Sequence, residues 1–326
     1  MLIKMQVGEQ DRGELQVNVT DSDNAPIRDA RVTISEPETA INPNSPIERL
    51  ETDVSGQTQI VDLNTPPLEY SLNENNENMP YANYNIQIEA PGYETENISN
   101  VEILPDSLSL QDVRMRRREG EQVENIDIDP HTLYAEYPEK IPEDEIKDVN
   151  EPGEIVLSRV VIPEYVVVHN GTPSSNARDY YVTYKDYIKN VASSEIYATW
   201  PRATIEANVL AIMSFTLNRV YTEWYRNKGY DFTITSSTAY DQKWIYGRNI
   251  FQSIDEVVDE IFDQYLSRPD VRQPILTQYC DGKRVTCPNW LSQWGSCNLG
   301  EQGFGTLEII RNYYGDDMYI NTAEQI

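Results

Sequence analysis

A single glutamate, Glu195, stands in the stretch ASSEIYATWP at residues 192–201, between two serines and an apolar run that ends in Trp-Pro. A carboxyl group serves as a general acid near neutral pH only if its pKa is raised, and burial beside Ile196 and Trp200 would raise it by desolvating the charge. A solvated glutamate before Pro201 would instead decorate a helix N-terminus, where carboxylates are favoured. Residue spacing alone leaves both interpretations open.

The elements that must position Glu195 are predicted to be helices. VTYKDYIKNVASSEI, residues 182–196, places its apolar residues on one stripe. A longer helix is expected from Pro201 to about Asn227, with Gly229 as its stop signal. A third opens at Ser253, and a short one covers 305–315. With the extended, turn-rich pieces between them, these helices predict an α+β domain over residues 156–326.

The N-terminal part has a different period. Residues 13–115 contain short segments in which apolar residues alternate, such as LQVNV at 15–19 and YNIQIEA at 84–90, separated by turns rich in Gly, Asn, Asp and Pro. This pattern predicts an antiparallel β-sandwich over residues 1–115. Residues 116–155 are rich in Glu, Asp, Pro and Asn and follow neither period, so they are expected to form an acidic linker, with His131 as an exposed residue in it.

Composition excludes several classes of function. The net charge is −28, and most of it falls in the first half of the chain. Such a field repels phosphate backbones, so no nucleic-acid partner is expected. No apolar run is long enough to span a bilayer, so no membrane span is expected. MLIKMQVGEQDRGEL carries no recognisable secretory signal, and delivery by another route, or a cytoplasmic location, is the expectation.

The N-terminal segments resemble a known domain type. GELQVNVTDSDNAPIRDARVTIS, ETDVSGQTQIVDL and YNIQIEAPGYETE, in that order, are similar to the carboxypeptidase regulatory-like domain, a small transthyretin-like sandwich. The resemblance implies a scaffold or adhesion module without chemistry of its own, through which assembly partners could bind.

Four blocks of the C-terminal part resemble stage II sporulation protein D and the related amidase-enhancer domain. They are DYIKNVASSEIYATWP, TSSTAYDQKWIYG, LTQYCDG and LSQWGSCNLGEQGFGTLEIIRNYYGDD, and together they cover roughly residues 180–320. The family resemblance implies a peptidoglycan lytic transglycosylase that cleaves glycan strands. It aligns Glu195 with the family's catalytic glutamate, a single group that acts first as acid and then as base.

The same resemblance implies that the other blocks line a cleft for the glycan. Their polar and aromatic residues are candidates to hydrogen-bond sugar hydroxyl and acetamido groups or to stack on sugar rings: Ser194, Asp241, Gln242, Tyr246, Tyr279, Trp290, Ser292 and Gln293. Asp241 could equally be a turn residue. Trp294 is expected in the core.

The three cysteines are Cys280, Cys287 and Cys297. Some relatives carry His and Cys near the third block that could bind a metal, but here no histidine stands nearby. Tetrahedral zinc requires four N or S ligands, so no metal and no cofactor are expected. A disulfide between Cys280 and Cys287 would close the DGKRVT hairpin if the protein matures in an oxidising compartment, and free thiols are expected otherwise.

The sequence therefore predicts a β-sandwich, an acidic linker and an α+β domain that cleaves peptidoglycan with Glu195 as acid and base. The alternative is a non-catalytic module that binds the cell wall or enhances a separate amidase. Release on lysis, incorporation in a spore layer and carriage on a phage or injection particle are the delivery routes that fit either reading.

Overall fold

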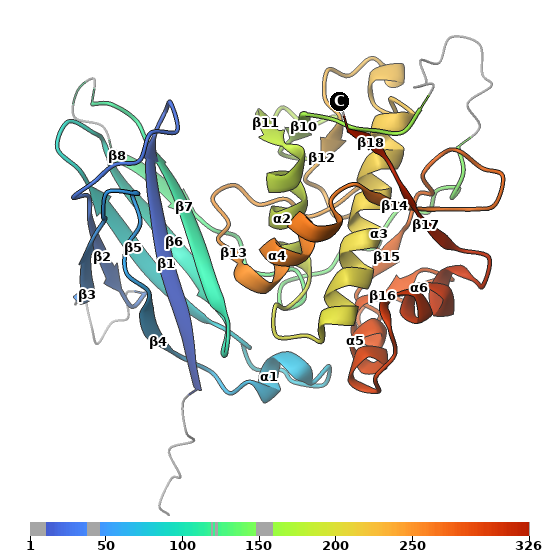
Figure 1. Ribbon diagram of the computed structural model, residues 1–326, viewed down its shortest axis with the longest axis horizontal. Helices are drawn as coiled ribbons and strands as arrows, with labels where there is room; N and C mark the ends of the chain where they lie inside the picture. Colours follow the sequence, from blue (N-terminus) through green and yellow to red (C-terminus); the bar gives the residue numbers. More distant parts are fainter. Residues whose placement is uncertain (1–10, 38–45, 119, 121–122, 148–158, 326) are drawn as a thin grey trace, which may run out of the picture. The chain divides into compact units, whose positions relative to one another are not determined.

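The computed structural model describes residues 11–37, 46–118, 120, 123–147 and 159–325. The chain forms two compact units. The first unit contains residues 1–130 and 246–252, and the second contains residues 131–245 and 253–326. The protein is thus a multi-domain chain with many strands in several sheets and a smaller number of helices (Figure 1).

Two sheets form the first unit. One has the order β13-β7-β1-β4 and the other the order β3-β2-β5-β6-β8. The elements are β1 (Asp11–Asp21), β2 (Arg31–Ser35), β3 (Pro46–Glu51), β4 (Val61–Thr65), α1 (Glu69–Leu72), β5 (Ala82–Glu89), β6 (Thr95–Ile103), β7 (Leu108–Met115), β8 (Val123–Asp127) and β13 (Ile250–Phe251).

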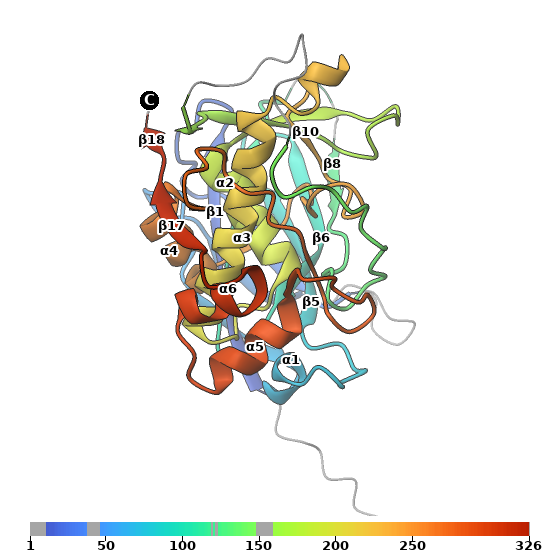
Figure 2. The same ribbon diagram turned by 90° about the vertical axis from the view of Figure 1, so that its right-hand side faces the viewer.

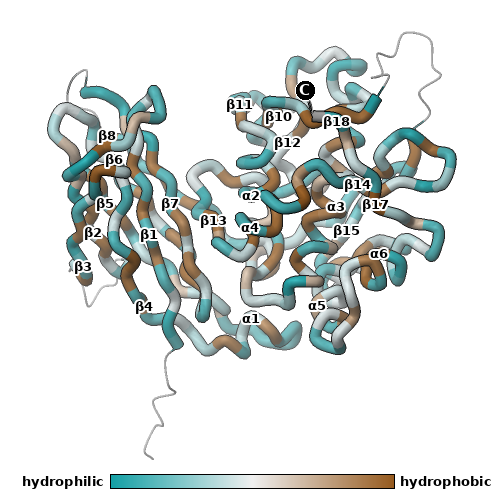
Figure 3. Tube along the Cα trace, in the orientation of Figure 1, coloured by the Kyte–Doolittle hydropathy of each residue, from teal (hydrophilic) through white to brown (hydrophobic). Residues whose placement is uncertain are grey.

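Period-two alternation builds the interior of this unit. Leu15, Val17 and Val19 on β1 are fully buried, as are Val32 and Ile34 on β2, while the residues between them are less buried. Hydrophobic and hydrophilic residues recur along these strands in Figure 3. The alternation places one face of each sheet inward, as the sequence predicts.

The prediction of a purely antiparallel sandwich is wrong in one respect. β1 pairs with β7 in parallel, and β6 pairs with β8 in parallel, whereas the other pairs are antiparallel. Strands of the other sheet lie between β1 and β7 in the sequence, so the chain returns to its first sheet running in its original direction. A parallel pair needs such a crossover, which alternation in the sequence does not encode.

Residues 246–252 belong to the first unit although 115 residues separate them from Pro130. β13 pairs with β7. The Asn249 side chain accepts from the Glu102 backbone N–H at 3.1 Å and donates to the Glu102 carbonyl at 2.8 Å, and the buried Arg248 pairs with the Glu102 carboxylate. The predicted domain boundaries place this segment in the C-terminal domain, and the structure corrects that assignment.

The second unit is arranged around one long helix. Its elements are β9 (Val161–Ile162), β10 (Tyr165–His169), β11 (Asp179–Thr183), α2 (Tyr184–Glu195), α3 (Arg202–Tyr221), η1 (Arg226–Lys228), β12 (Ile234–Thr235), α4 (Gln252–Ile261), β14 (Gln264–Ser267), β15 (Tyr279–Cys280), β16 (Leu291–Ser292), α5 (Gln293–Glu301), α6 (Thr306–Tyr314), β17 (Tyr319–Thr322) and β18 (Glu324–Gln325). Helix α3 is buried along nearly its whole length and packs against α2, α5, α6 and β14 (Figure 2).

Helix α3 ends six residues before the predicted Asn227. Glu223 has a positive φ of 47°, which interrupts the helical backbone directly after the cap residue Thr222. A 3₁₀ turn follows, and Gly229, at φ 85°, ends it. The apolar period continues past Tyr221 because Trp224 and Tyr225 still contact the core, although they are no longer helical.

Helix α5 is absent from the sequence predictions because Gly295 and Gly300 lower its intrinsic helix propensity. A Cβ at Gly300 would lie 2.0 Å from the Thr204 hydroxyl on α3, and one at Gly295 would lie 2.3 Å from the Tyr313 hydroxyl on α6. The two glycines therefore allow the close packing of α5 against α3 and α6.

The predicted linker over residues 116–155 is also corrected. Residues 123–127 form strand β8. Residues 131–147, which we call the strap, form no helix or strand and pack onto the second unit, while residues 148–155 lie outside the described residues. His131 is fully buried and not exposed, and its ring lies 4.5 Å from that of Tyr197. Among the described residues, no helix is both long and apolar enough to cross a bilayer.

Candidate functional site

Glu195 is the last residue of α2. The helix begins at the cap residue Thr183, whose hydroxyl accepts from the Asp186 backbone N–H, and ends where Ile196 turns into extended backbone. The 3.6-residue period places Tyr187, Ile188 and Val191 on the buried face of the helix. Glu195, at the end of the helix, is also buried and is 0% exposed. The interpretation of Glu195 as a solvated charge is therefore excluded.

The two carboxylate oxygens of Glu195 have different surroundings. Oε1 accepts a hydrogen bond from the Lys243 backbone N–H at 2.7 Å. Oε2 is buried and has no hydrogen-bond partner among the residues that the structure describes. A buried carboxylate with one unpaired oxygen is costly, whereas a protonated carboxyl is tolerated there.

Burial raises the pKa of Glu195 because the charged form loses its hydration. The Lys140 ammonium, the Tyr279 hydroxyl and the Lys243 backbone N–H act in the opposite direction and only partly offset burial. The Tyr279 hydroxyl lies close enough to Glu195 to favour its charged form. Within the described chain, however, neither this hydroxyl nor Glu195 Oε2 makes a hydrogen bond of full geometry. The site thus combines a carboxyl group of raised pKa with groups beside it that stabilise its conjugate base.

Two residues of the strap complete the surroundings of Glu195. The buried Lys140 donates to the Asp241 backbone carbonyl at 3.0 Å, and its Nζ lies 4.3 Å from the centre of the Tyr279 ring. Burial lowers the pKa of Lys140, and the charges of Glu195 and Asp241 oppose that shift. Tyr137 is also buried, and burial together with the negative charge of Glu195 raises its pKa. Sequence reasoning missed both residues because their acidic, Pro-rich segment lacks any period.

Unpaired polar atoms gather in this region. Side-chain atoms that are buried and without a hydrogen-bond partner in the described residues include the Tyr137 and Tyr279 hydroxyls, Glu195 Oε2, Ser194 Oγ and Gln293 Oε1. Native proteins leave few such atoms, and each calls for a specific explanation. A site that takes a polar ligand explains the cluster around Glu195.

Gln293 reaches Glu195, as the predicted cleft requires. Its Nε2 donates to the Glu195 backbone carbonyl at 3.1 Å from the first turn of α5. Ser292 precedes it as the cap residue of α5 and accepts from the Gly295 backbone N–H at 2.9 Å. The fourth block therefore fixes the end of α2, and Ser292 has a structural role at the start of α5.

Gln242 precedes Lys243, whose backbone N–H binds Glu195, but the Gln242 side chain is not free to bind a sugar. Its Oε1 accepts from the Tyr187 hydroxyl at 3.1 Å and from the Thr216 hydroxyl at 2.8 Å, and its Nε2 donates to the Ile212 carbonyl at 3.1 Å. The side chain is fully buried. Gln242 instead ties α2 to α3 and holds the loop that carries Lys243.

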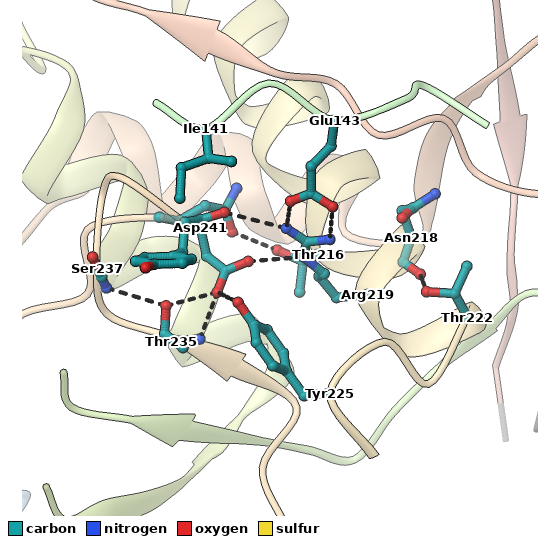
Figure 4. A network of polar contacts seen from close by, with 12 residues as sticks. Ile141, Glu143, Thr216, Asn218, Arg219, Thr222, Tyr225, Thr235, Ser237 and Asp241 are labelled. Carbon is teal, nitrogen blue, oxygen red and sulfur yellow. Dashed lines mark hydrogen bonds and ion pairs between the residues drawn. The ribbon is translucent and has the colours of Figure 1, made fainter. Parts of the chain in front are cut away.

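Asp241 closes a turn, with its backbone N–H donating to the Ser237 carbonyl at 2.7 Å, and its carboxylate is the centre of a buried ionic network (Figure 4). Oδ1 accepts from Arg219 Nε at 2.7 Å. Oδ2 accepts from the Tyr225 hydroxyl at 2.7 Å, the Thr235 hydroxyl at 2.7 Å and the Thr235 backbone N–H at 2.9 Å. Arg219 also binds Glu143 of the strap through two hydrogen bonds. With these acceptor positions filled, Asp241 holds the architecture together.

The remaining candidates lie in different places. Tyr246 belongs to the first unit, where its hydroxyl contacts Glu124 at 3.3 Å. Trp290 is partly buried in the loop before β16. Trp294 is in the core, as expected, with its ring 5.2 Å from that of Trp200 and 6.0 Å from that of Tyr197. Ser194 is fully buried beside Glu195 in the helix.

A disulfide joins Cys280 and Cys287, with their Cα atoms 5.7 Å apart, and Cys297 is a buried free thiol. In the described ranges no group of three or more His, Cys, Asp or Glu residues is arranged to hold a metal ion. His169 is held elsewhere in the second unit, where Nδ1 lies 2.6 Å from Asp179 Oδ1 and the ring stacks on Phe232.

Comparisons with known proteins give no assignment. No protein-family model matches the chain, and the search of curated proteins found no significant match. Solved structures that share part of the chain include a minor pilin of Streptococcus agalactiae, with 17% identity over 35% of this chain and 48% of its own and a TM-score of 0.24. The TIE protein of Bacillus anthracis shares 13% identity over 33% of this chain and 17% of its own, with a TM-score of 0.21.

A third, catechol 1,2-dioxygenase of Acinetobacter radioresistens, shares 13% identity over 36% of this chain and 58% of its own, with a TM-score of 0.24. The chain thus spans less than two thirds of each of these proteins. Likenesses this weak carry no argument about function.

Proposed function

We propose that the second unit is a peptidoglycan lytic transglycosylase in which Glu195 is both general acid and general base. The supporting observation is the state of this carboxyl group: it is 0% exposed, burial raises its pKa, and one oxygen lacks a hydrogen-bond partner in the described chain. General acid catalysis requires a carboxyl group whose pKa is raised above its ordinary value, as burial does for Glu195.

The chemistry needs only one carboxyl group. Glu195 donates its proton to the glycosidic oxygen as the bond from that oxygen to C1 breaks. The C6 hydroxyl of the same sugar then attacks C1, and the Glu195 carboxylate accepts the hydroxyl proton. A 1,6-anhydro sugar forms, no water is consumed, and the acid is restored for the next cycle.

The residues around Glu195 suit both steps. During the lifetime of the carboxylate, the Lys243 backbone N–H and the Tyr279 hydroxyl stabilise its charge. Such preorganised groups act strongly in a site from which water is excluded. In the resting state, burial outweighs them and raises the pKa of Glu195.

A digest of purified sacculi tests the proposal. The wild-type protein should release fragments that end in 1,6-anhydro sugars, identified by mass spectrometry, and Glu195→Gln should release at least about 10²-fold less, because general acid catalysis contributes on this order. Glu301→Gln, which neutralises an exposed carboxylate at the end of α5, serves as the matched control and should match the wild type. Equal release by wild type and Glu195→Gln would refute the role of Glu195.

The non-catalytic alternative keeps the same glycan partner. If no protein releases fragments but the chain sediments with sacculi, a wall-binding or amidase-enhancing role replaces the enzymatic one. The complete burial of Glu195 is the observation that favours this alternative.

We also propose that the first unit is a carboxypeptidase regulatory-like adapter that carries the second unit to the cell wall within a larger assembly, such as a spore layer or a phage or injection particle. Its two sheets, built from strands with one buried face, are compatible with a binding module. Fractionation of spores, particles and cytosol, followed by immunodetection, would locate the protein.

A further inference from the structure

Glu195 has no accessible surface, yet a glycan polymer must reach it if the proposed function is right. The strap, residues 131–147, contributes two buried side chains to the surroundings of this carboxyl group. Tyr137 and Lys140 turn inward from the strap toward the Glu195 carboxyl group, and both are buried. At the N-terminal end of the strap, the Thr132 backbone N–H donates to the Ser194 carbonyl at 3.0 Å, one residue from Glu195.

Side-chain amides of the second unit hold the strap by its main chain. Gln278 accepts from the Glu143 backbone N–H at 2.9 Å and donates to the Ile141 carbonyl at 2.8 Å. Gln273 accepts from the Lys147 backbone N–H at 2.7 Å and donates to the Lys147 carbonyl at 3.3 Å. Each glutamine side chain therefore binds one backbone N–H and one backbone carbonyl of the strap.

Other residues of the second unit also form hydrogen bonds with the backbone of the strap. The Arg284 guanidinium donates to the Thr132 carbonyl at 2.9 Å and to the Ala135 carbonyl. The Ile141 backbone N–H donates to the Ala239 carbonyl at 2.9 Å. The surface under the strap therefore presents donors and acceptors that recognise amide groups, and one of these contacts, at Thr132, lies one residue from Glu195.

An acetamido group presents the same N–H donor and C=O acceptor as a peptide group, and peptidoglycan sugars carry one each. We propose that the strap occupies the glycan-binding groove of the second unit, where its peptide groups take the places of substrate acetamido groups, and that it must leave before an N-acetylated glycan can bind. This inference rests on the proposed function for the identity of the glycan.

The strap is built so that it can leave. Within 131–147 it has no regular secondary structure, and its outward residues Tyr134, Glu136 and Glu139 are exposed. Arg219 remains paired with Asp241 at 2.7 Å when Glu143 departs, so no buried charge is left alone. Apparent glycan affinity is then the intrinsic affinity reduced by the small fraction of molecules with an open groove.

The double variant Tyr137→Ala/Lys140→Ala in the full chain tests this prediction. It removes the inward side chains of the strap and leaves Gln273, Gln278 and Arg284 in place. Binding of purified, stem-peptide-free glycan strands, measured by calorimetry, should strengthen at least about tenfold. The matched control Tyr134→Ala/Glu139→Ala changes exposed strap residues and should bind as the wild type does. N-deacetylated strands should gain no affinity with either variant.

Hydrogen exchange of the wild-type chain gives a second measurement that requires no variant. Saturating glycan should speed exchange at the Thr132, Ile141 and Glu143 amides, because the strap is displaced. Unchanged exchange at these amides with glycan bound, or equal affinity of wild type and Tyr137→Ala/Lys140→Ala, would overturn the inference, as would a failure of every form to bind.

The two proposals fail in different ways. Stronger glycan binding by Tyr137→Ala/Lys140→Ala without anhydro products sustains the strap inference and refutes the enzymatic function. Release of anhydro products at equal rates by wild type and this variant sustains the function and refutes the inference.

Discussion

Asp241→Asn should destabilise the second unit strongly, although the substitution changes neither size nor shape. Asp241 and Arg219 are both 0% exposed, and Asp241 accepts four hydrogen bonds, three of them at Oδ2. An amide nitrogen at the Oδ2 position would face three donors, and one at the Oδ1 position would face the Arg219 N–H. Either orientation breaks charge-assisted hydrogen bonds in a site that water does not reach.

The expected loss of unfolding free energy depends on the partners that Arg219 keeps in the Asp241→Asn variant. Breaking a buried ion pair by removing one charge costs about 3–5 kcal/mol. Arg219 keeps the Glu143 carboxylate, which accepts two of its hydrogen bonds, so the lower end of this range, about 3 kcal/mol, is expected. With a urea dependence of about 3 kcal/mol per molar, the unfolding midpoint should fall by about 1 M.

Tryptophan fluorescence is a selective assay for this prediction. All five tryptophans, Trp200, Trp224, Trp244, Trp290 and Trp294, belong to the second unit, so urea unfolding followed by their emission reports that unit alone. This selectivity removes the ambiguity of a two-unit chain with two transitions.

Asp259→Asn is the matched control. Asp259 pairs with Lys185 and Lys189, each at 3.0 Å, but its side chain is 45% exposed. The same chemical change there should cost less than about 1 kcal/mol. If Asp241→Asn costs no more than Asp259→Asn, the buried network does not hold the second unit together, and our account of Asp241 is refuted.

Two further predictions concern pH. Because burial raises the pKa of Glu195 in the folded state, the stabilisation that this residue gives the second unit is fully present below its unfolded pKa and is lost as pH rises through the folded value. Glu195→Gln should therefore gain stability relative to wild type as pH rises above the unfolded pKa, when urea unfolding is followed by tryptophan emission. A constant difference between the two proteins as pH rises would contradict the assigned burial effect. In the first unit, the pKa of Glu96 is raised from 4.5 to about 7, mainly by burial and secondly by the negative charge of Glu124. The stability of the wild-type protein should therefore fall as pH rises between these two values. Glu96→Gln should reduce this dependence by up to about 1.4 kcal/mol per pH unit, measured by hydrogen exchange at β6, and an unchanged pH profile would show that Glu96 is already ionised.

The network around Asp241 also explains how distant segments reach Glu195. Arg219 on α3, Glu143 on the strap and Asp241 before β13 meet in one buried cluster, and the next residues after Asp241 are Gln242 and Lys243. Gln242 anchors this loop to α2 and α3, and Lys243 donates its N–H to Glu195. The position of the Lys243 backbone N–H, which donates to the acid, thus depends on residues that have no contact with substrate in our proposal.

Local periodicity determined much of this protein. The alternation of Leu15, Val17 and Val19 specifies a strand with one buried face, and the stripe through Tyr187, Ile188 and Val191 specifies α2 and places Glu195 at its end. These patterns can be read without coordinates because burial of one face imposes the period of the element on the sequence. The stretch around Glu195 and the proximity of Cys280 to Cys287 are local features of the same kind.

Only the tertiary structure decided the rest, because it depends on contacts between distant residues that leave no periodic trace. The strap is buried through main-chain hydrogen bonds to Gln273 and Gln278, and these can be made by almost any sequence, so its composition is that of a linker. Asp241 and Gln242 resemble ligand-binding residues in the sequence, yet their partners Arg219 and Thr216 fill their polar atoms from another helix. The pKa of Glu195 likewise depends on burial, which raises it, and on Lys140 and Tyr279, which oppose that shift, and only the folded chain brings these groups together.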